Sequence, residues 1–242
     1  MRLMATKIID KLVIDGKGSA VVFDGLDFTA SGYVEVKNAG SITIKNCRVY
    51  NLDLVDVKNY WLKIFGDIEV KLVIENCFFG SNPSANGRMV YNLIEPTAKL
   101  MNGSSISNNY FKKDCCFHNV INVYGMIDNS VININGNIIE QTAGGIRIGI
   151  KGNKTGTINI KDNTILEKHP AYTNEDQGLV TIQPYNKETI SFAGLNIVLS
   201  GNKMPSEQVI YGYYGANDTV LDANTAPNII LNGKKHELVI YH

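Results

Sequence analysis

Three acidic side chains in this sequence could take part in catalysis. Asp53 and Asp56 lie three positions apart, and Glu175 lies in a polar interval that we expect to form a loop. A glycosidase of the inverting type needs two carboxyl groups around the bond it breaks, one acting as acid and one as base. These three residues are therefore candidates for polysaccharide cleavage, provided that the fold brings a pair of them to one groove.

Cysteine and histidine could supply a nucleophile or metal ligands. On a strand, Cys116 and His118 would share a face, but no third group nearby would orient the histidine. The four histidines are far apart in sequence and do not have the spacing of a zinc site. We interpret the four cysteines as buried, inert thiols and expect neither a metal ion nor a cofactor.

Aromatic residues are stronger candidates for ligand binding. The segment 211–215 reads Tyr-Gly-Tyr-Tyr-Gly, which places Tyr211 and Tyr213 on one face of a strand with Tyr214 next to them. Trp61 follows a tyrosine in a segment that we expect to be a loop. Exposed Tyr and Trp rings stack on sugars or anchor protein interfaces. Packing of these rings against a neighbouring part of the fold is the alternative.

A six-residue pattern recurs along the chain and would position all of these side chains. It reads apolar, variable, Asn/Gly/Asp, Asn or Cys, variable, apolar. Clear copies begin at Ile44, Ile74, Ile106, Ile134, Ile160 and Leu199, and looser copies begin at Phe23 and Leu231. The copies are separated by 21 to 39 residues, and a unit repeated at such a period is the signature of a solenoid.

Most copies begin at the end of a strand-like stretch and contain a tight turn. Residues 41–44 (Ser-Ile-Thr-Ile), for example, alternate polar and apolar side chains, which is the period of a half-buried strand. The Asn, Gly or Asp that follows tolerates a left-handed backbone. Antiparallel hairpins would show turn signals every 8–12 residues or so. The longer, regular return of one turn favours parallel strands, stacked at roughly 4.8 Å.

Stacking would place equivalent residues of successive units in columns. The first apolar position of the pattern forms an inward column that consists of Phe23, Ile44, Ile74, Ile106, Ile134, Ile160, Leu199 and Leu231. Another column begins at Leu26 and continues with Cys47, Cys77, Asn109, Asn137, Asn163 and Asn202. Stacked Asn side chains satisfy one another's amides, and Cys is a small residue that fits the same space. We therefore predict a structural ladder at this second column.

The composition limits the fold and the partners. With 44% hydrophobic and 19% charged residues the chain can bury a large core, and we expect a single domain over residues 1–242. The formal net charge is zero and Lys and Arg form no dense run, so nothing indicates binding to nucleic acid or to a membrane. The N-terminus lacks the apolar stretch of a signal peptide, so we expect folding in a cytoplasm.

These columns resemble the right-handed parallel β-helix superfamily, often called pectin-lyase-like. The segment 12–18 (Leu-Val-Ile-Asp-Gly-Lys-Gly) is similar to that family's first coil, and the resemblance covers about residues 8–241. It implies an all-β fold, a single-stranded right-handed parallel β-helix (solenoid) of about seven to nine coils. The Asn-Thr-Asp, Asp-Asp, Gly-His-Gly and Arg-Ile-Lys elements of its polygalacturonase-like enzymes are not intact here. We interpret Arg147, in the nearest match, as a solvated strand residue and assign no catalytic residue.

Proteins of this superfamily include lyases, hydrolases, adhesins and phage tail proteins. The missing export signal and catalytic elements favour a non-enzymatic structural or receptor- and glycan-binding component of a bacteriophage virion, as a tail, appendage or decoration protein. Proteins that resemble tailspikes are commonly trimers, so we expect a homotrimer that contacts other virion proteins and a host surface glycan. The alternative is a polysaccharide lyase or glycoside hydrolase of the pectin-lyase-like type.

Overall fold

The computed structural model describes most of the repeat units. The described residues are 7–30, 32–52, 60–65, 69–80, 92–96, 98–113, 115, 119–142, 145–149, 155–168, 180–182, 192–205, 209–212, 227–236 and 239–241. In these ranges every regular element is a β-strand, so the all-β prediction is confirmed. No helix that could span a membrane occurs among the described residues.

The strands form three sheets, which we name A, B and C. Sheet A consists of β1 (Lys7–Ile8), β4 (Asp27–Ala30), β7 (Arg48–Leu52), β10 (Phe78–Phe79), β14 (Tyr110–Phe111), β17 (Ile138–Thr142) and β20 (Thr164–Lys168). Sheet B consists of β2 (Leu12–Asp15), β5 (Val34–Lys37), β8 (Tyr60–Phe65), β11 (Asn92–Pro96), β15 (Asn119–Val123), β18 (Gly145–Ile148), β21 (Val180–Ile182), β23 (Val209–Gly212) and β26 (Val239–Tyr241).

Sheet C is the longest of the three. It consists of β3 (Ala20–Asp24), β6 (Ser41–Lys45), β9 (Glu69–Glu75), β13 (Ser105–Ser107), β16 (Ser130–Asn135), β19 (Thr155–Lys161), β22 (Gly194–Ser200), β24 (Asn228–Leu231) and β25 (Lys234–Lys235). The short strand β12 (Lys99–Leu100) pairs with β9 beside this path.

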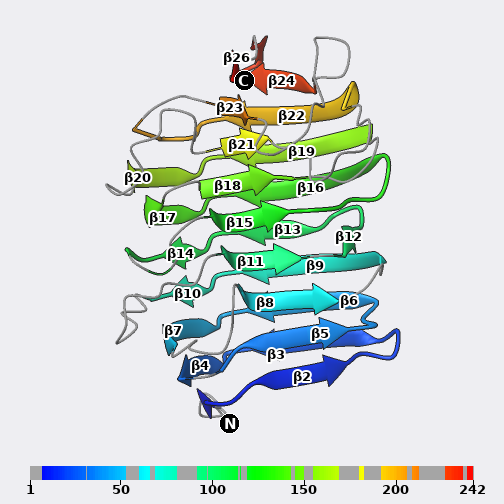
Figure 1. Ribbon diagram of the computed structural model, residues 1–242, viewed down its shortest axis with the longest axis vertical. Helices are drawn as coiled ribbons and strands as arrows, with labels where there is room; N and C mark the ends of the chain where they lie inside the picture. The colour runs from blue at the N-terminus through cyan, green and yellow to red at the C-terminus, as the bar shows by residue number, and fades with distance from the viewer. Residues whose placement is uncertain are drawn as a thin grey trace.

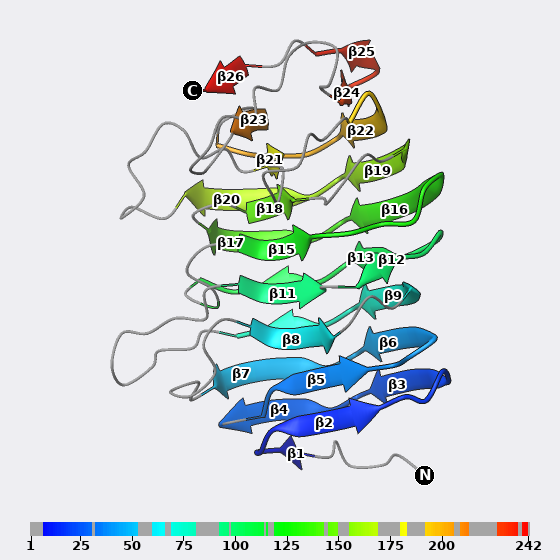
Figure 2. The ribbon, with the colours of Figure 1, turned by 45° about the vertical axis from the view of Figure 1, so that its right-hand side comes forward.

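From β2 to β22 the described strands follow the three sheets in rotation. A strand of sheet B is followed by one of sheet C and then one of sheet A, as in β2, β3 and β4, and we call each such pass a unit. Successive units stack along the long axis of the molecule, with the two termini at opposite ends (Figures 1 and 2). The described pairings are parallel except for β24 with β25, so the parallel arrangement is confirmed over antiparallel hairpins.

The register aligns the inward column that the pattern predicts. Phe23 pairs with Ile44, Ile44 with Ile74, and the series continues through Ile106, Ile134, Ile160 and Leu199 to Leu231. All of these side chains are buried except that of Leu231, which is partly buried. Strand alternation sends these residues inward, so the interior is one continuous apolar core along the stack.

The turn between sheet C and sheet A has one backbone conformation throughout. Its φ angle lies between 55° and 70° at Gly25, Asn46, Asn76, Asn108, Gly136, Asp162 and Gly201. In this left-handed region a Cβ is strained, and Gly, Asn and Asp are the residues that adopt it most readily. This physical limit explains why the turn position is so restricted in sequence.

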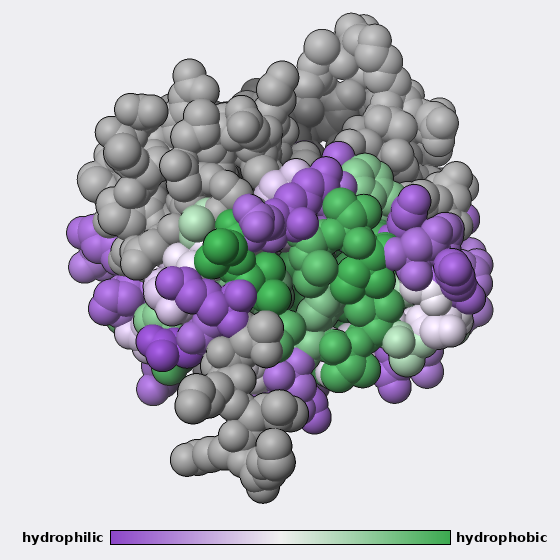
Figure 3. All heavy atoms as spheres, turned by 90° about the horizontal axis from the view of Figure 1, so that it is seen from below, coloured by the Kyte–Doolittle hydropathy of each residue, from purple (hydrophilic) through white to green (hydrophobic). Residues whose placement is uncertain are grey.

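The end of the stack that holds the first strands exposes part of the core. Ile8, Leu12 and Ile14 are only partly buried, although they pack against the buried cluster. Seen from this end, apolar side chains occupy the centre and hydrophilic residues surround them (Figure 3).

Candidate functional site

The predicted ladder column is a continuous series of hydrogen bonds. The side-chain amide of Asn109 donates to the Oδ1 atom of Asn137, that of Asn137 to Asn163, and that of Asn163 to Asn202, at 2.9–3.0 Å. Each amide also donates to a carbonyl of the preceding unit, for example from Asn137 to Ile106 at 2.9 Å. The column therefore satisfies its buried polar atoms within itself, which is what a structural role requires.

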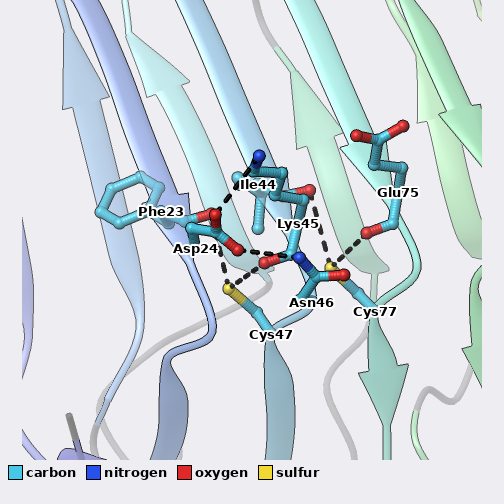
Figure 4. Close-up of polar contacts among 8 residues, drawn as sticks. All are labelled: Phe23, Asp24, Ile44, Lys45, Asn46, Cys47, Glu75 and Cys77. Atoms are coloured by element: carbon cyan, nitrogen blue, oxygen red, sulfur yellow. Dashed lines mark hydrogen bonds and ion pairs between the residues drawn. The ribbon is translucent and has the colours of Figure 1, made fainter. Parts of the chain in front are cut away.

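Cys47 and Cys77 extend this column toward the N-terminus. Each thiol donates to the carbonyl of the inward residue of the preceding unit, Phe23 at 3.7 Å and Ile44 at 3.6 Å (Figure 4). The backbone N–H of Cys77 donates to the Oδ1 atom of Asn109 at 2.9 Å. In these two units the Cys thiol therefore makes contacts equivalent to those that the Asn side-chain amide makes at the same position in later units.

Trp61 corrects the prediction of a surface loop residue. It lies within β8, its side chain is fully buried, and its Nε1 atom donates to the carbonyl of Gly32 at 3.2 Å. Its ring makes edge contacts with Phe28 and Phe79, with centroid distances of 5.2 and 5.4 Å. Such a ring is core and has no surface to offer a sugar.

The other predicted site residues are not described in full. Tyr211 lies in β23, and its backbone pairs with Ile182 and Ile240, but the structure describes only its backbone. Tyr213, Tyr214, Asp53, Asp56, Glu175, Cys116 and His118 lie outside the described residues. Cys115 is buried. In the described part of the chain, no three His, Cys, Asp or Glu side chains are arranged to hold a metal ion.

An aromatic and basic surface lies on the outer face of sheet A. Arg48, Phe78 and Tyr110 occupy one outward position in three successive units, because Arg48 pairs with Phe78 and Phe78 with Tyr110. The rings of Phe78 and Tyr110 are stacked, with centroids 5.8 Å apart and an interplanar angle of 16°. The Arg48 guanidinium lies 5.4 Å from the ring centroid of Tyr50. We call these four residues the aromatic strip.

The shape of the strip depends on a glycine and continues in apolar residues. A Cβ at Gly80 would lie 2.9 Å from the Cβ of Tyr50 and 3.1 Å from the ring of Phe78, so glycine leaves room for both side chains. Ile138 pairs with Tyr110 in the next unit and is 40% exposed. Leu166, two positions after the Thr164 that pairs with Ile138, is 54% exposed. The strip therefore opens onto a longer apolar surface.

A carboxylate borders the strip. Glu140 accepts hydrogen bonds from the hydroxyl of Tyr110 and, at 2.8 Å, from the backbone N–H of Lys113, and Lys112 lies 3.8 Å away. The Tyr110 and Lys113 hydrogen bonds lower the pKa of Glu140, and the same contact raises the pKa of Tyr110. The carboxylate is thus ionised at neutral pH and fixed beside the rings, where it can accept hydrogen bonds from hydroxyl groups.

Two polar side chains on sheet B also point to a ligand. Among the described residues, both polar atoms of the Asn122 amide are buried and have no hydrogen-bond partner, and the Nε atom of Arg147 is in the same state. Asn122 pairs with Arg147, whose guanidinium lies 5.6 Å from the ring centroid of Tyr124. Buried amides without partners are rare, and a bound water or ion, backbone strain or a catalytic role are the usual kinds of explanation. Arg147, predicted from the sequence to be a solvated strand residue, lies in β18 and is half-buried.

Sequence reasoning missed the aromatic strip because it looked for clusters of neighbouring aromatic residues. The three rings of the strip, Tyr50, Phe78 and Tyr110, lie 28 and 32 positions apart in the sequence. The available signal was the variable position after the Asn or Cys, which the alternation of the strand sends outward. Read down the copies, this position holds Arg48, Phe78, Tyr110, Ile138 and Thr164.

No protein-family model matches the chain, and no significant match was found among curated proteins or among solved structures.

Proposed function

We propose that this protein is a non-enzymatic scaffold that binds a glycan through the aromatic strip. The observation that carries the proposal is the stacked pair of Phe78 and Tyr110 on the outer face of sheet A. We further propose that the stacked units form a single-stranded right-handed parallel β-helix. In this architecture, equivalent outward residues follow one another along the axis at strand spacing, about 4.8 Å.

The chemistry of the strip fits a sugar chain. Aromatic rings offer apolar faces to the C–H groups of a sugar, while a few polar groups at the border fix its orientation. Here Glu140 supplies an acceptor, and Arg48 and Lys112 supply charged donors. Because the strip spans three units, it suits an extended chain better than a small compact ligand.

The biological setting that we propose is a bacteriophage virion, in which the protein is a tail, appendage or decoration component. It would meet other virion proteins and a glycan on the host surface. The sequence resemblance supports this setting, and it also motivates the proposal of a homotrimer. Light scattering tests the trimer: a solution mass of about three times the 26.7 kDa chain is expected, and a monomer would contradict it.

Binding to a panel of neutral and acidic polysaccharides, measured by calorimetry, tests the role of the strip. Phe78→Ala and Tyr110→Ala should each weaken binding by about tenfold, since a stacked ring contributes on the order of 1 kcal/mol. Val131→Ala is the matched control, because Val131 is exposed on β16 of sheet C, away from the strip. Equal affinities in all three variants, or no binding by the unaltered protein, would contradict the proposal.

Polysaccharide cleavage is the second candidate, and the buried polar atoms of Asn122 and Arg147 on sheet B favour it. The same polysaccharides can be assayed for new reducing ends and for the ultraviolet absorbance of an unsaturated product. Cleavage that is lost in Arg147→Ala and retained in Phe78→Ala would move the function from sheet A to sheet B. No cleavage of any acidic polysaccharide in the panel is the result expected for a binding scaffold.

A further inference from the structure

Two thiols lie one above the other at the start of the ladder column. The residues that follow them, Arg48 and Phe78, are paired, and the backbone N–H of Phe78 donates to the carbonyl of Cys47 at 2.9 Å. Cys47 and Cys77 are therefore separated by one strand spacing, about 4.8 Å. Both are free cysteines, with 1% and 2% of their surface exposed.

The two side chains point the same way. Besides the carbonyl of the preceding unit, each sulfur contacts the carbonyl two residues before it, Lys45 at 3.2 Å for Cys47 and Glu75 at 3.3 Å for Cys77 (Figure 4). Because the contacts of the two sulfurs are equivalent, the distance between the sulfurs is close to the strand spacing, about 4.8 Å.

This sulfur separation decides which chemistry fits. A disulfide requires sulfurs about 2.05 Å apart and Cβ atoms nearer than the strand spacing. A tetrahedral zinc site requires four ligands, and the described residues supply no third ligand from His, Cys, Asp or Glu. In a linear S–metal–S unit, two bonds of about 2.3 Å, the length of a zinc–thiolate bond, place the sulfurs about 4.6 Å apart. Only the linear unit matches the stacked thiols without moving the backbone.

We propose that Cys47 and Cys77 form a binding site for one soft, two-coordinate cation of the copper(I) type. Thiolates are the soft ligands that select this ion. On binding, each thiol releases its proton to solvent and its sulfur forms one bond to the cation, so no atom is oxidised or reduced. The site is distinct from the aromatic strip and does not depend on the glycan function.

Backbone N–H groups lie beside both sulfurs. The backbone N–H of Leu26 donates toward Cys47, and that of Cys47 donates toward Cys77, as the backbone N–H of Cys77 does toward Asn109 in the next unit. Burial excludes water and hard ions, which favour oxygen ligands.

Silver(I), which is soft, two-coordinate and redox-inert, is the first probe. It is titrated into the reduced protein carrying Cys115→Ser and Cys116→Ser, so that only Cys47 and Cys77 can respond. We expect one silver ion per chain, thiolate-to-metal absorbance in the ultraviolet, and a rise of roughly 5–10 °C in the unfolding midpoint at a hundredfold excess over Kd. If this reduced double variant binds no silver, the proposal is overturned.

The variant Cys77→Asn separates loss of the site from loss of the fold. Asparagine is the residue that this column holds in the next units, so the variant extends the ladder, and circular dichroism should show an unchanged fold. It should bind no silver, and retention of one silver ion per chain would overturn the proposal. Copper(I), added under oxygen-free conditions in competition with a colorimetric chelator, should bind at the same ratio of one ion per chain. If the protein binds silver but not copper(I), the assignment to copper(I) is refuted.

Discussion

Replacing Asn137 by leucine tests whether the ladder contributes to stability. The side chain of Asn137 is fully buried and takes part in four hydrogen bonds. It donates to Asn163 and to the carbonyl of Ile106, both at 2.9 Å, and it accepts from the backbone and side-chain nitrogens of Asn109, both at 3.0 Å. Leucine has a similar volume but can replace none of these contacts.

The free-energy cost follows from the groups that lose their partners. Two N–H groups of Asn109 would remain buried without a partner, and the carbonyl of Ile106 would lose its side-chain donor. The Oδ1 atom of Asn163 would still accept from the backbone of residue 137. At about 1–2 kcal/mol per orphaned group the loss is about 3–6 kcal/mol. Burying the apolar leucine offsets about 2 kcal/mol. We expect a net loss of about 1–4 kcal/mol in the free energy of unfolding, with a central value of about 2.5 kcal/mol.

Thermal unfolding followed by circular dichroism is the assay. A loss of this size lowers the midpoint by about 5–10 °C in a chain of this length. Asn159→Leu is the matched control in the next unit. Asn159 is half-buried on the outer face, where its amide donates to Asn133, and water can replace that bond. It should change stability by at most about 0.5 kcal/mol. Equal shifts in the two variants would refute the reasoning.

Three further predictions concern other parts of the stack. Gly156→Ala should lower the free energy of unfolding by more than about 2 kcal/mol, because the φ of Gly156 is 129° and a Cβ would lie 2.5 Å from the carbonyl oxygen of Ser130. Gly25→Ala, at a φ of 70° with no atom close to the new Cβ, should lower it by about 1 kcal/mol, and chemical denaturation measures both. Hydrogen bonds lower the pKa of Glu140 in the folded state, so its contribution to stability is present above its unfolded pKa of about 4.5 and is lost as the pH falls through the folded pKa. In urea titrations the stability difference between the protein and Glu140→Gln should therefore shrink at acid pH. The single tryptophan, Trp61, should emit at short wavelength and resist acrylamide quenching, and ready quenching would contradict its place in the core.

The columns of the fold could be predicted from the sequence because physics restricts their residue types. The left-handed turn admits Gly, Asn and Asp, and the inward position admits apolar side chains, so a pattern such as that from Ile44 to Val49 marks turn and register together. The hydrogen bonds among Asn109, Asn137 and Asn163 follow from the same register. At these positions the backbone of the turn and the stacking of the units require the same residue types. The fold of these columns can therefore be predicted from the sequence alone.

Trp61 could not be placed by the same reasoning. The alternation of β8 sends Leu62 and Ile64 inward, which by parity sends Trp61 outward, yet all three are buried. Trp61 stands at the beginning of the strand, where the chain arrives from sheet A, and its ring reaches Phe28 and Phe79 on that sheet. The alternation of side chains along one strand does not predict which residues are buried where the chain turns from one sheet to the next. The sequence pattern therefore fails at such a corner.

The outward column of sheet A is the position that the fold leaves most free, and this freedom makes its residues informative. The same column accepts Arg48 in one unit and Thr164 in another, so neither the turn nor the core requires rings at Phe78 and Tyr110. A stacked pair can still stabilise the sheet, by about 0.5–1.5 kcal/mol. If folding were its only role, Phe78→Ala and Tyr110→Ala would lower stability by that amount and leave glycan affinity unchanged. If the strip binds glycan, affinity must fall under conditions in which both variants remain fully folded, and measuring stability and affinity in one buffer separates the two roles.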